Sequence, residues 1–125
     1  HTGKADANVT DWSNRTPASD MFLSVVTIHE LEIGILRLAR RDPFQAGQFR
    51  KWLTDYILPS FDGQILPVSV EVAQWSAAYH VPDPAPFRDS FIAATAHVHG
   101  LTVVTRNTSN FLHCGVPLLN PWQPR

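Results

Sequence analysis

Two acidic residues, Glu30 and Asp89, are candidates for binding a metal ion through their carboxylates. Glu30 lies in the string TIHELEIG, just after the apolar run MFLSVV, and Asp89 opens the small-residue run DSFIAATAHVHG. Two carboxylates that meet in the folded chain could hold a hard divalent cation, which prefers oxygen ligands. Such an ion lowers the pKa of a bound water and stabilises developing charge on phosphate oxygens. The two acids therefore raise the hypothesis of a metal-dependent hydrolytic site.

Purely structural roles explain the same acids. Thr27 and Glu30 have the spacing of a capping box, in which each side chain pairs with a free backbone N–H at a helix start. Asp89 follows a proline-rich stretch and could cap the helix that begins there. From the residues alone, capping and metal binding stay open for both acids. Glu32 lies two residues after Glu30, on another helix face, and we expect it to be a solvated charge.

The apolar patterns predict the elements that would position these acids. Strands are predicted over residues 21–26, 64–68, 101–105 and 116–119. Helices are predicted directly after the first strand, from the Asp42-Pro43 cap to a stop before Pro59, from Ser69 to the break at residues 81–86, and from Asp89 to Gly100. The second helix is expected to bury Ala46, Phe49, Leu53 and Tyr56.

This alternation predicts an α/β domain in which helices cover a parallel sheet. In such sheets, sites gather beyond the carboxyl ends of the strands. Residues 24–30 and 106–110 follow two of the predicted strands. A helix from Asp89 to Gly100 spans roughly 17 Å, and the strand at 101–105 runs back about as far. We therefore expect Arg106 and Asn107 to return to the side of Asp89.

Composition narrows the class of protein. A chain of 125 residues with 44% apolar and 17% charged residues fits one globular domain, which we divide into a polar segment at 1–20 and a domain at 21–125. With a net charge of −1, the chain has no overall positive charge that would attract nucleic acid. No apolar run approaches the ~20 residues of a membrane span. The single cysteine, Cys114, suits a reducing compartment, so we expect a cytoplasmic protein without a membrane partner.

The remaining reactive side chains give weaker signals. His97 and His99 lie two residues apart on a predicted helix and cannot easily converge on one zinc ion. His29, His80 and His113 have no partners at metal-ligand spacing. The sequence identifies no base beside Cys114, which argues against a thiol nucleophile.

In their order along the chain, the motifs TIHELEIGIL, ILPV, RDSFIAATAHVHGLTVVTRN and GVPLLNPW resemble the PIN-domain family. The likeness is greatest to the VapC and FitB-like toxins of toxin–antitoxin pairs, and it covers about residues 21–122. The resemblance implies a three-layer PIN-like fold with a short parallel sheet. It also implies a ribonuclease that uses Mg²⁺ or Mn²⁺.

Matching positions carry the family's functional residues onto this chain. Glu30 and Asp89 would be catalytic acids and metal ligands, with Asn107 as a further ligand. Contacts to substrate or to the acids are implied for Ser24, Thr105, Arg106 and Asn110. Arg37, Arg40 and Arg41 would grip the RNA backbone or form a solvated helix end. The implied partners are a cognate antitoxin, RNA and a second copy of the chain in a homodimer.

Two departures from the family pattern bear on activity. Members usually open with a strand that ends in an aspartate, and residues 1–20 contain no such strand. We therefore expect a missing upstream segment of about fifteen to twenty residues. Asn107 and Asn110 stand where the family often has aspartate, which predicts weaker cation binding.

These departures motivate a rival hypothesis, a PIN-like binding module that has lost cleavage. A third option, another small α/β fold with a phosphate-receiving acid, requires an acid directly after the first strand, which this chain lacks.

Overall fold

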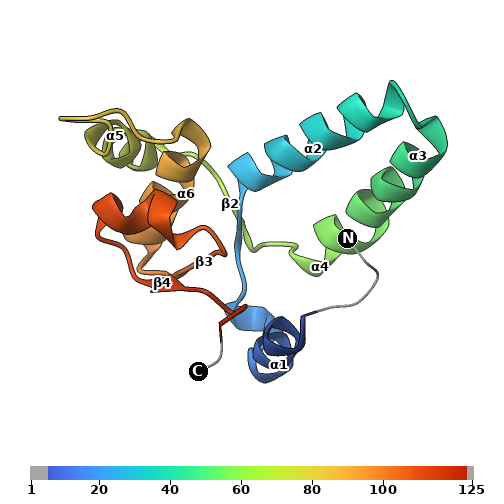
Figure 1. Cartoon of the computed structure of the whole chain (residues 1–125), viewed down its shortest axis with the longest axis horizontal. Coiled ribbons are helices and arrows are strands. Elements are labelled where there is room, and N and C mark those ends of the chain that lie inside the picture. Colours follow the sequence, from blue (N-terminus) through green and yellow to red (C-terminus); the bar gives the residue numbers. More distant parts are fainter. Residues whose placement is uncertain (1–5, 124–125) are drawn as a thin grey trace. The chain divides into compact units, whose positions relative to one another are not determined.

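The computed structural model describes residues 6–123. The chain forms two compact units, one of Met21–Pro67 and one that combines the N-terminal segment with the residues from Val68 onward. The first unit contains β1 (Leu23–Ser24), α2 (Val25–Ala39), α3 (Pro43–Trp52), η2 (Leu53–Ile57), α4 (Leu58–Ser60) and β2 (Ile65–Leu66) (Figure 1). The second contains α1 (Ala7–Arg15), η1 (Ala18–Asp20), α5 (Val70–Ala78), α6 (Phe87–His99), β3 (Val103–Val104), η3 (Thr108–Cys114) and β4 (Leu118–Leu119).

The strands pair in parallel, as predicted, but each is only two residues long. Leu23 pairs with Ile65 in one sheet, and Val103 pairs with Leu118 in the other. The described residues thus form two separate two-stranded sheets rather than one continuous sheet. The pairing ends at Leu66 because the next residue, Pro67, has no N–H to donate.

Helix α2 begins earlier than the capping-box spacing predicts. The Ser24 hydroxyl accepts a hydrogen bond from the Val26 N–H at 3.0 Å, so Ser24 is the N-cap and the helix starts at Val25. Thr27 is therefore already the third helical residue, which excludes the capping-box alternative for Thr27 and Glu30. The early start also shortens the predicted strand at 21–26 to two residues.

The second helix begins as predicted but does not stop where expected. The Asp42 carboxylate accepts from the Gln45 N–H at 3.0 Å, with Pro43 at the first helical position. The helix then continues through a wide turn, in which the Leu58 N–H reaches the Leu53 carbonyl, and carries Pro59 in α4. Such a turn shifts the hydrogen-bond register, which accommodates a proline that would clash in a regular helix. The predicted stop before Pro59 is thus wrong.

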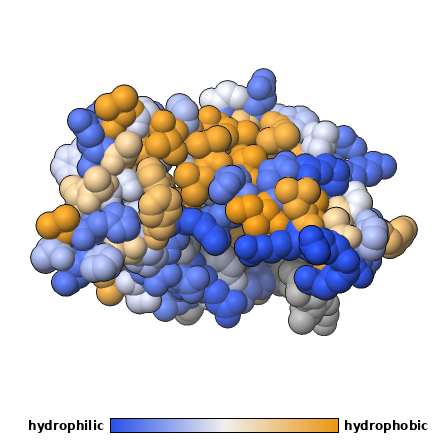
Figure 2. All heavy atoms as spheres, turned by 90° about the horizontal axis from the view of Figure 1, so that it is seen from above, coloured by the Kyte–Doolittle hydropathy of each residue, from blue (hydrophilic) through white to orange (hydrophobic). Residues whose placement is uncertain are grey.

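The face that this helix buries is narrower than predicted. Ala46 and Leu53 are buried, whereas Phe49 is 45% exposed and Tyr56 is 62% exposed. The Phe49 ring instead lies edge-on to Trp52, with 6.5 Å between ring centroids. Other large apolar residues are exposed as well, and Figure 2 shows apolar side chains at the surface among polar ones.

The second unit has its core between α6 and the chain that follows it. The buried residues are Ala93, Ala96, Val103, Phe111, Cys114 and Val116, and the half-buried Tyr79, Ile92, Leu101 and Leu118 pack against them. On α6 itself, Ala93, Ala94 and Ala96 are all buried, and their small side chains let the helix lie close to its surroundings. The small-residue run of the sequence is therefore the core face of a helix.

Helix α6 ends at Gly100 as predicted, with a left-handed φ of 66° that glycine adopts without strain. Its start differs from the prediction. The helix begins at Phe87, and the Ser90 N–H donates to the Pro86 carbonyl at 2.9 Å. Asp89 thus lies inside the first turn, and of the two roles left open for it, that of N-cap is excluded.

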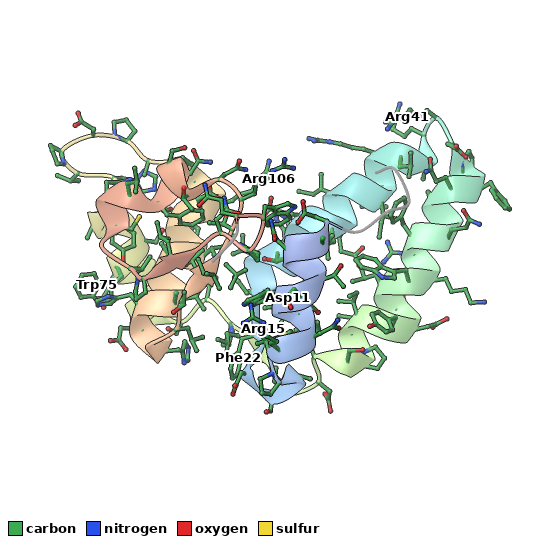
Figure 3. All side chains as sticks on the ribbon, turned by 60° about the horizontal axis from the view of Figure 1, so that its bottom comes forward. Asp11, Arg15, Phe22, Arg41, Trp75 and Arg106 are labelled. Atoms are coloured by element: carbon green, nitrogen blue, oxygen red, sulfur yellow. The ribbon has the colours of Figure 1, made fainter. Side chains whose placement is uncertain are left out.

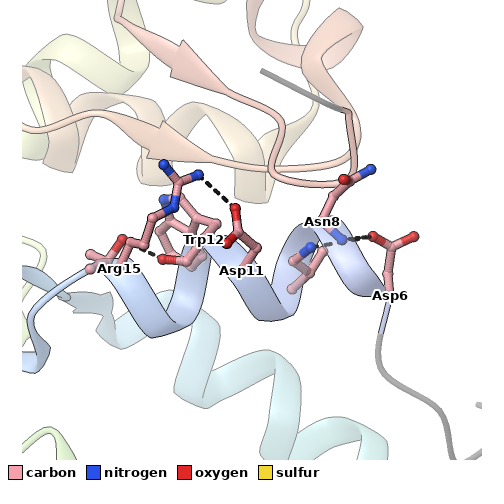
Figure 4. A network of polar contacts seen from close by, with 7 residues as sticks. Asp6, Asn8, Asp11, Trp12 and Arg15 are labelled. Carbon is pink, nitrogen blue, oxygen red and sulfur yellow. Dashed lines mark hydrogen bonds and ion pairs between the residues drawn. The ribbon is translucent and has the colours of Figure 1, made fainter.

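The polar N-terminal segment contains a helix that we did not predict. The Asp6 carboxylate caps α1 by accepting from the Asn8 and Val9 N–H groups, at 2.8 and 3.3 Å. Asp11 and Arg15 form an ion pair at 2.8 Å one turn apart (Figure 4). An aspartate cap followed by an i, i+4 ion pair was the available signal.

Among residues 6–123, no helix is both long and apolar enough to cross a membrane.

Candidate functional site

Asp89 and Asn110 form the polar contact at the centre of the candidate site. Asp89 is half-buried in the first turn of α6, and Asn110 lies in η3. The Asn110 side-chain N–H donates to the Asp89 carboxylate at 3.1 Å. The chain after β3 therefore returns to Asp89 through Asn110, and the predicted place of Arg106 and Asn107 beside Asp89 stays a prediction.

The turn between β3 and η3 has a side-chain hydrogen bond of its own. The Asn107 backbone N–H donates to the Thr105 hydroxyl at 3.0 Å, and the Asn107 carbonyl accepts from the Asn110 N–H at 3.1 Å. Thr105 and Asn107 thus shape the turn that presents Asn110 to Asp89. Metal binding by Asn107 stays a prediction.

Arg106 has an aromatic neighbour that the sequence did not identify. Its guanidinium carbon lies 5.7 Å from the centroid of the Trp122 ring, within the range of a cation–π interaction. The Arg106 side chain, labelled in Figure 3, is exposed. Trp122 is half-buried. Stacking leaves the guanidinium N–H groups able to donate to an anion.

Glu30 and Ser24 belong to the other unit. Ser24 is buried, and its hydroxyl serves as the cap of α2. Glu30 is half-buried on the second turn of α2. Arg37, Arg40 and Arg41 are exposed at the far end of α2, where Arg41 lies next to the turn into α3 (Figure 3). The pairing of Glu30 with Asp89 stays a prediction.

Glu32 is in part solvated, as we expected, with 37% of its side chain exposed, but it is also paired with a cation. Its two carboxylate oxygens accept from the two terminal nitrogens of Arg50, at 2.6 and 2.7 Å. The hydrogen bond from Arg50 lowers the pKa of Glu32 below its ordinary value. Glu32 therefore links α2 to α3.

The negative charge of Asp89 acts on the thiol of Cys114. Burial, and then the Asp89 carboxylate, raise the pKa of Cys114 above its ordinary value. His113 lies close, with 3.6 Å between its Nε2 atom and the Cys114 sulfur, a neighbour that sequence analysis missed. The raised pKa keeps the thiol protonated at neutral pH, so this pair lacks the thiolate that a nucleophile needs.

The donor set around Asp89 fits a hard cation only in part. A carboxylate and an amide are oxygen ligands that suit Mg²⁺ or Mn²⁺, and Mg²⁺ usually keeps several waters. The amide carries no charge, however, and it donates a hydrogen bond to the carboxylate. Within residues 6–123, no three His, Cys, Asp or Glu side chains gather closely enough to hold a metal ion.

Comparisons with known proteins agree with the prediction from the motifs. Residues 4–114 match the family model of the PIN domain. The chain is 35% identical over 120 residues to Toxin FitB of Neisseria gonorrhoeae, a match that covers 91% of this chain and 84% of FitB. It is 32% identical over 130 residues to VapC ribonuclease Y4jK of Sinorhizobium fredii, covering 95% of this chain and 87% of that protein.

A solved structure matches the fold. The crystal structure of FitAcB from Neisseria gonorrhoeae superposes with a TM-score of 0.88 at 31% identity, and covers 98% of this chain and 90% of that chain. The predicted fold class, with helices around short parallel strands, is thereby confirmed.

Proposed function

The chain belongs to the PIN-domain family, within the branch of the FitB and VapC toxins, and from this premise we propose that it is a metal-dependent endoribonuclease toxin. Its substrate would be RNA, whose phosphodiester bonds it hydrolyses. The similarity to a VapC ribonuclease supports the reaction class. The contact between Asp89 and Asn110 carries the assignment of the site, because it joins two positions that match the family's functional motifs.

Each proposed residue has a distinct task. Glu30 and Asp89 would hold one Mg²⁺ or Mn²⁺ through carboxylate oxygens, and Asn107 would add a neutral oxygen. Such an ion would supply an activated water and stabilise charge on the phosphate. Asn110 orients the Asp89 carboxylate through its hydrogen bond. Arg106, stacked on Trp122, donates to the phosphate of the substrate, while Ser24 and Thr105 support the surrounding turns.

Isosteric removal of each acid charge tests this mechanism. We expect Asp89→Asn and Glu30→Gln each to lower RNA cleavage in the presence of Mg²⁺ or Mn²⁺ by about a hundredfold or more, because each removes a charged ligand. Calorimetry should show weaker Mn²⁺ binding for both variants. Cleavage is measured on labelled RNA with purified protein.

Two exposed acids supply matched controls. Asp83 lies in the loop before α6 and Glu71 on α5. Asp83→Asn and Glu71→Gln should both cleave like the unaltered protein. If the Glu30 and Asp89 variants cleave as fast as these controls, the proposed mechanism is wrong.

The hydrogen bond from Asn110 also motivates the rival function, a binding module without cleavage. Asn110→Asp separates the two. A second carboxylate beside Asp89 should tighten Mn²⁺ binding about tenfold if the site holds a cation, since an added anionic ligand favours the ion. Absence of Mn²⁺ binding in both forms, with tight binding of an antitoxin, would favour the rival.

For partners, we propose a cognate antitoxin that neutralises the enzyme and a homodimer as the assembled form. The similarity to Toxin FitB supports the first. Co-expression with a candidate antitoxin and light scattering of the purified protein test the two separately.

A further inference from the structure

A polar network forms around Ser90, the residue that follows Asp89, and its hydrogen bonds fix the first turn of α6. Its members are His80 in the α5–α6 connection, Ser76 in α5, and Ser90 in α6. Ser76 and Ser90 are buried, with Ser90 only 1% exposed. Because Ser90 is the residue next to Asp89, whatever fixes Ser90 also fixes the backbone that carries the acid.

The geometry determines which atoms carry the hydrogens. The Ala85 backbone N–H donates to His80 Nδ1 at 3.2 Å, so Nδ1 must be the acceptor nitrogen of a neutral ring. The ring hydrogen therefore lies on Nε2, which donates to the Ser90 hydroxyl oxygen at 3.1 Å. His80 thus bridges the connecting loop to the helix.

Ser90 has its full set of partners. Its hydroxyl donates to the Phe87 carbonyl at 2.6 Å, which uses its only hydrogen. The Ser76 hydroxyl, 2.9 Å away, must then donate to Ser90. With His80 as the second donor, the Ser90 oxygen accepts two hydrogen bonds. A buried network with every partner present defines one geometry strongly.

The start of α6 needs such support. Pro86 stands at its N-cap and makes no side-chain cap hydrogen bond. The preceding loop, residues 81–86, is exposed for most of its length. The His80 ring supplies this support. It contacts Ala85 on the loop, Ser90 on the helix and the ring of Phe87, with 6.2 Å between the ring centroids of His80 and Phe87.

We infer that His80 is a positioning residue for Asp89: through Ser90 it sets where α6 begins, and so where the Asp89 carboxylate meets Asn110. The expected effect on RNA cleavage rests on the proposed function. The effect of His80 on the position of the Asp89 carboxylate does not. Misplacing a catalytic group by about 1 Å can cost up to about a hundredfold in rate. His80 itself touches neither RNA nor the ion.

Three substitutions separate the two halves of the bridge. His80→Ala removes both contacts. His80→Asn keeps an acceptor for the Ala85 N–H but cannot reach Ser90, and His80→Gln restores a donor at the Ser90 distance. We expect kcat for RNA cleavage to fall about tenfold in the Ala and Asn variants, with KM within about twofold, and to recover in the Gln variant. His99→Ala, at the exposed far end of α6, is the control and should leave kcat unchanged.

A second measurement does not depend on cleavage. The Asn110 side-chain amide gives a resonance in a ¹H–¹⁵N spectrum, assigned by its loss in Asn110→Ala. This resonance should move in His80→Ala and His80→Asn, in the direction seen for Asp89→Asn, and return in His80→Gln. An unmoved resonance with unchanged kcat would overturn the inference, as would equal losses in the Asn and Gln variants. If the unaltered protein cleaves no RNA, the proposed function fails, and the resonance alone decides on His80.

Discussion

At the scale of single residues, Tyr79 contains the one buried hydroxyl that lacks a partner in the described part of the chain. Its oxygen is buried without a hydrogen bond, beside the Cys114 thiol. Burial, and then the charge of Cys114, raise the pKa of Tyr79 above its ordinary value of 10.0. An unpaired buried hydroxyl costs stability.

Tyr79→Phe should therefore stabilise the protein. We expect the free energy of unfolding to rise by about 1 kcal/mol at neutral pH, because the change removes an unsatisfied polar atom and keeps the ring. A raised folded pKa contributes stability that is complete below the unfolded value and is lost as pH rises through the folded one. The variant should thus lose less stability above pH 10.0 than the unaltered protein. Urea unfolding at neutral and alkaline pH measures both effects.

The other tyrosine provides the control. Tyr56 is exposed, so Tyr56→Phe should change neither the neutral nor the alkaline value. A loss of stability in Tyr79→Phe would mean that the hydroxyl has a partner after all.

Residue types alone could identify Asp89 but could not decide its role. Capping and ligation use the same carboxylate, and the choice depends on where α6 starts. That start is set by His80 and Ser90, which lie ten residues apart and meet only in the fold. Asn110 was predicted from its motif position, and its bond to Asp89 follows from the return of the chain through β3.

At the scale of elements, α2 and α3 are joined by the paired bonds between Glu32 and Arg50. Both side chains are more than a third exposed, which limits the contribution of the pair. The bond from Arg50 lowers the pKa of Glu32 from 4.5. A lowered folded pKa contributes stability that is present above the unfolded value and is lost as pH falls.

Glu32→Gln should lower the melting temperature slightly at neutral pH and low salt. The difference from the unaltered protein should shrink in high salt and disappear as pH falls well below 4.5, because protonation of Glu32 then removes the charge that the glutamine variant already lacks. Thermal unfolding by circular dichroism measures it. Glu71→Gln on the exposed face of α5 is the control. If it lowers the melting temperature by the same amount, the Glu32–Arg50 pair has no specific effect on stability.

Element types were predictable, whereas element lengths were not. Helical spacing and alternation identified α2, α3, α5, α6 and all four strands. Each strand was expected to be longer, because apolar residues continue past the point where hydrogen bonding stops. Ser24 ends β1 by capping a helix, and Pro67 ends β2 by lacking a donor, so single residues override the pattern.

At the scale of the whole chain, one hydrogen bond connects residues 114 positions apart. The Asn8 side-chain N–H donates to the Trp122 carbonyl at 2.9 Å, within the second unit. Local sequence patterns could not predict this contact, because no motif links Asn8 to Trp122. It attaches helix α1, which the Asp6 cap begins, to the C-terminal segment.

Asn8→Ala should release α1 from the C-terminal segment. We expect the free energy of unfolding to fall by about 1 kcal/mol, the typical contribution of one hydrogen bond. Limited proteolysis should also cut sooner near Trp122, since that segment loses an anchor. Asn14→Ala, an exposed position on the same helix, should do neither. Equal effects of the two variants would indicate a change in helix propensity instead.

The contact between Asn8 and Trp122 brings the two ends of the described chain together within the second unit. The contacts that stabilise this unit join elements that are neighbours in space, whatever their order along the chain. A circularly permuted chain, rejoined by a short linker across this contact and opened elsewhere, would keep the same tertiary interactions. Sequence order is therefore a poor guide to which parts of this unit support one another.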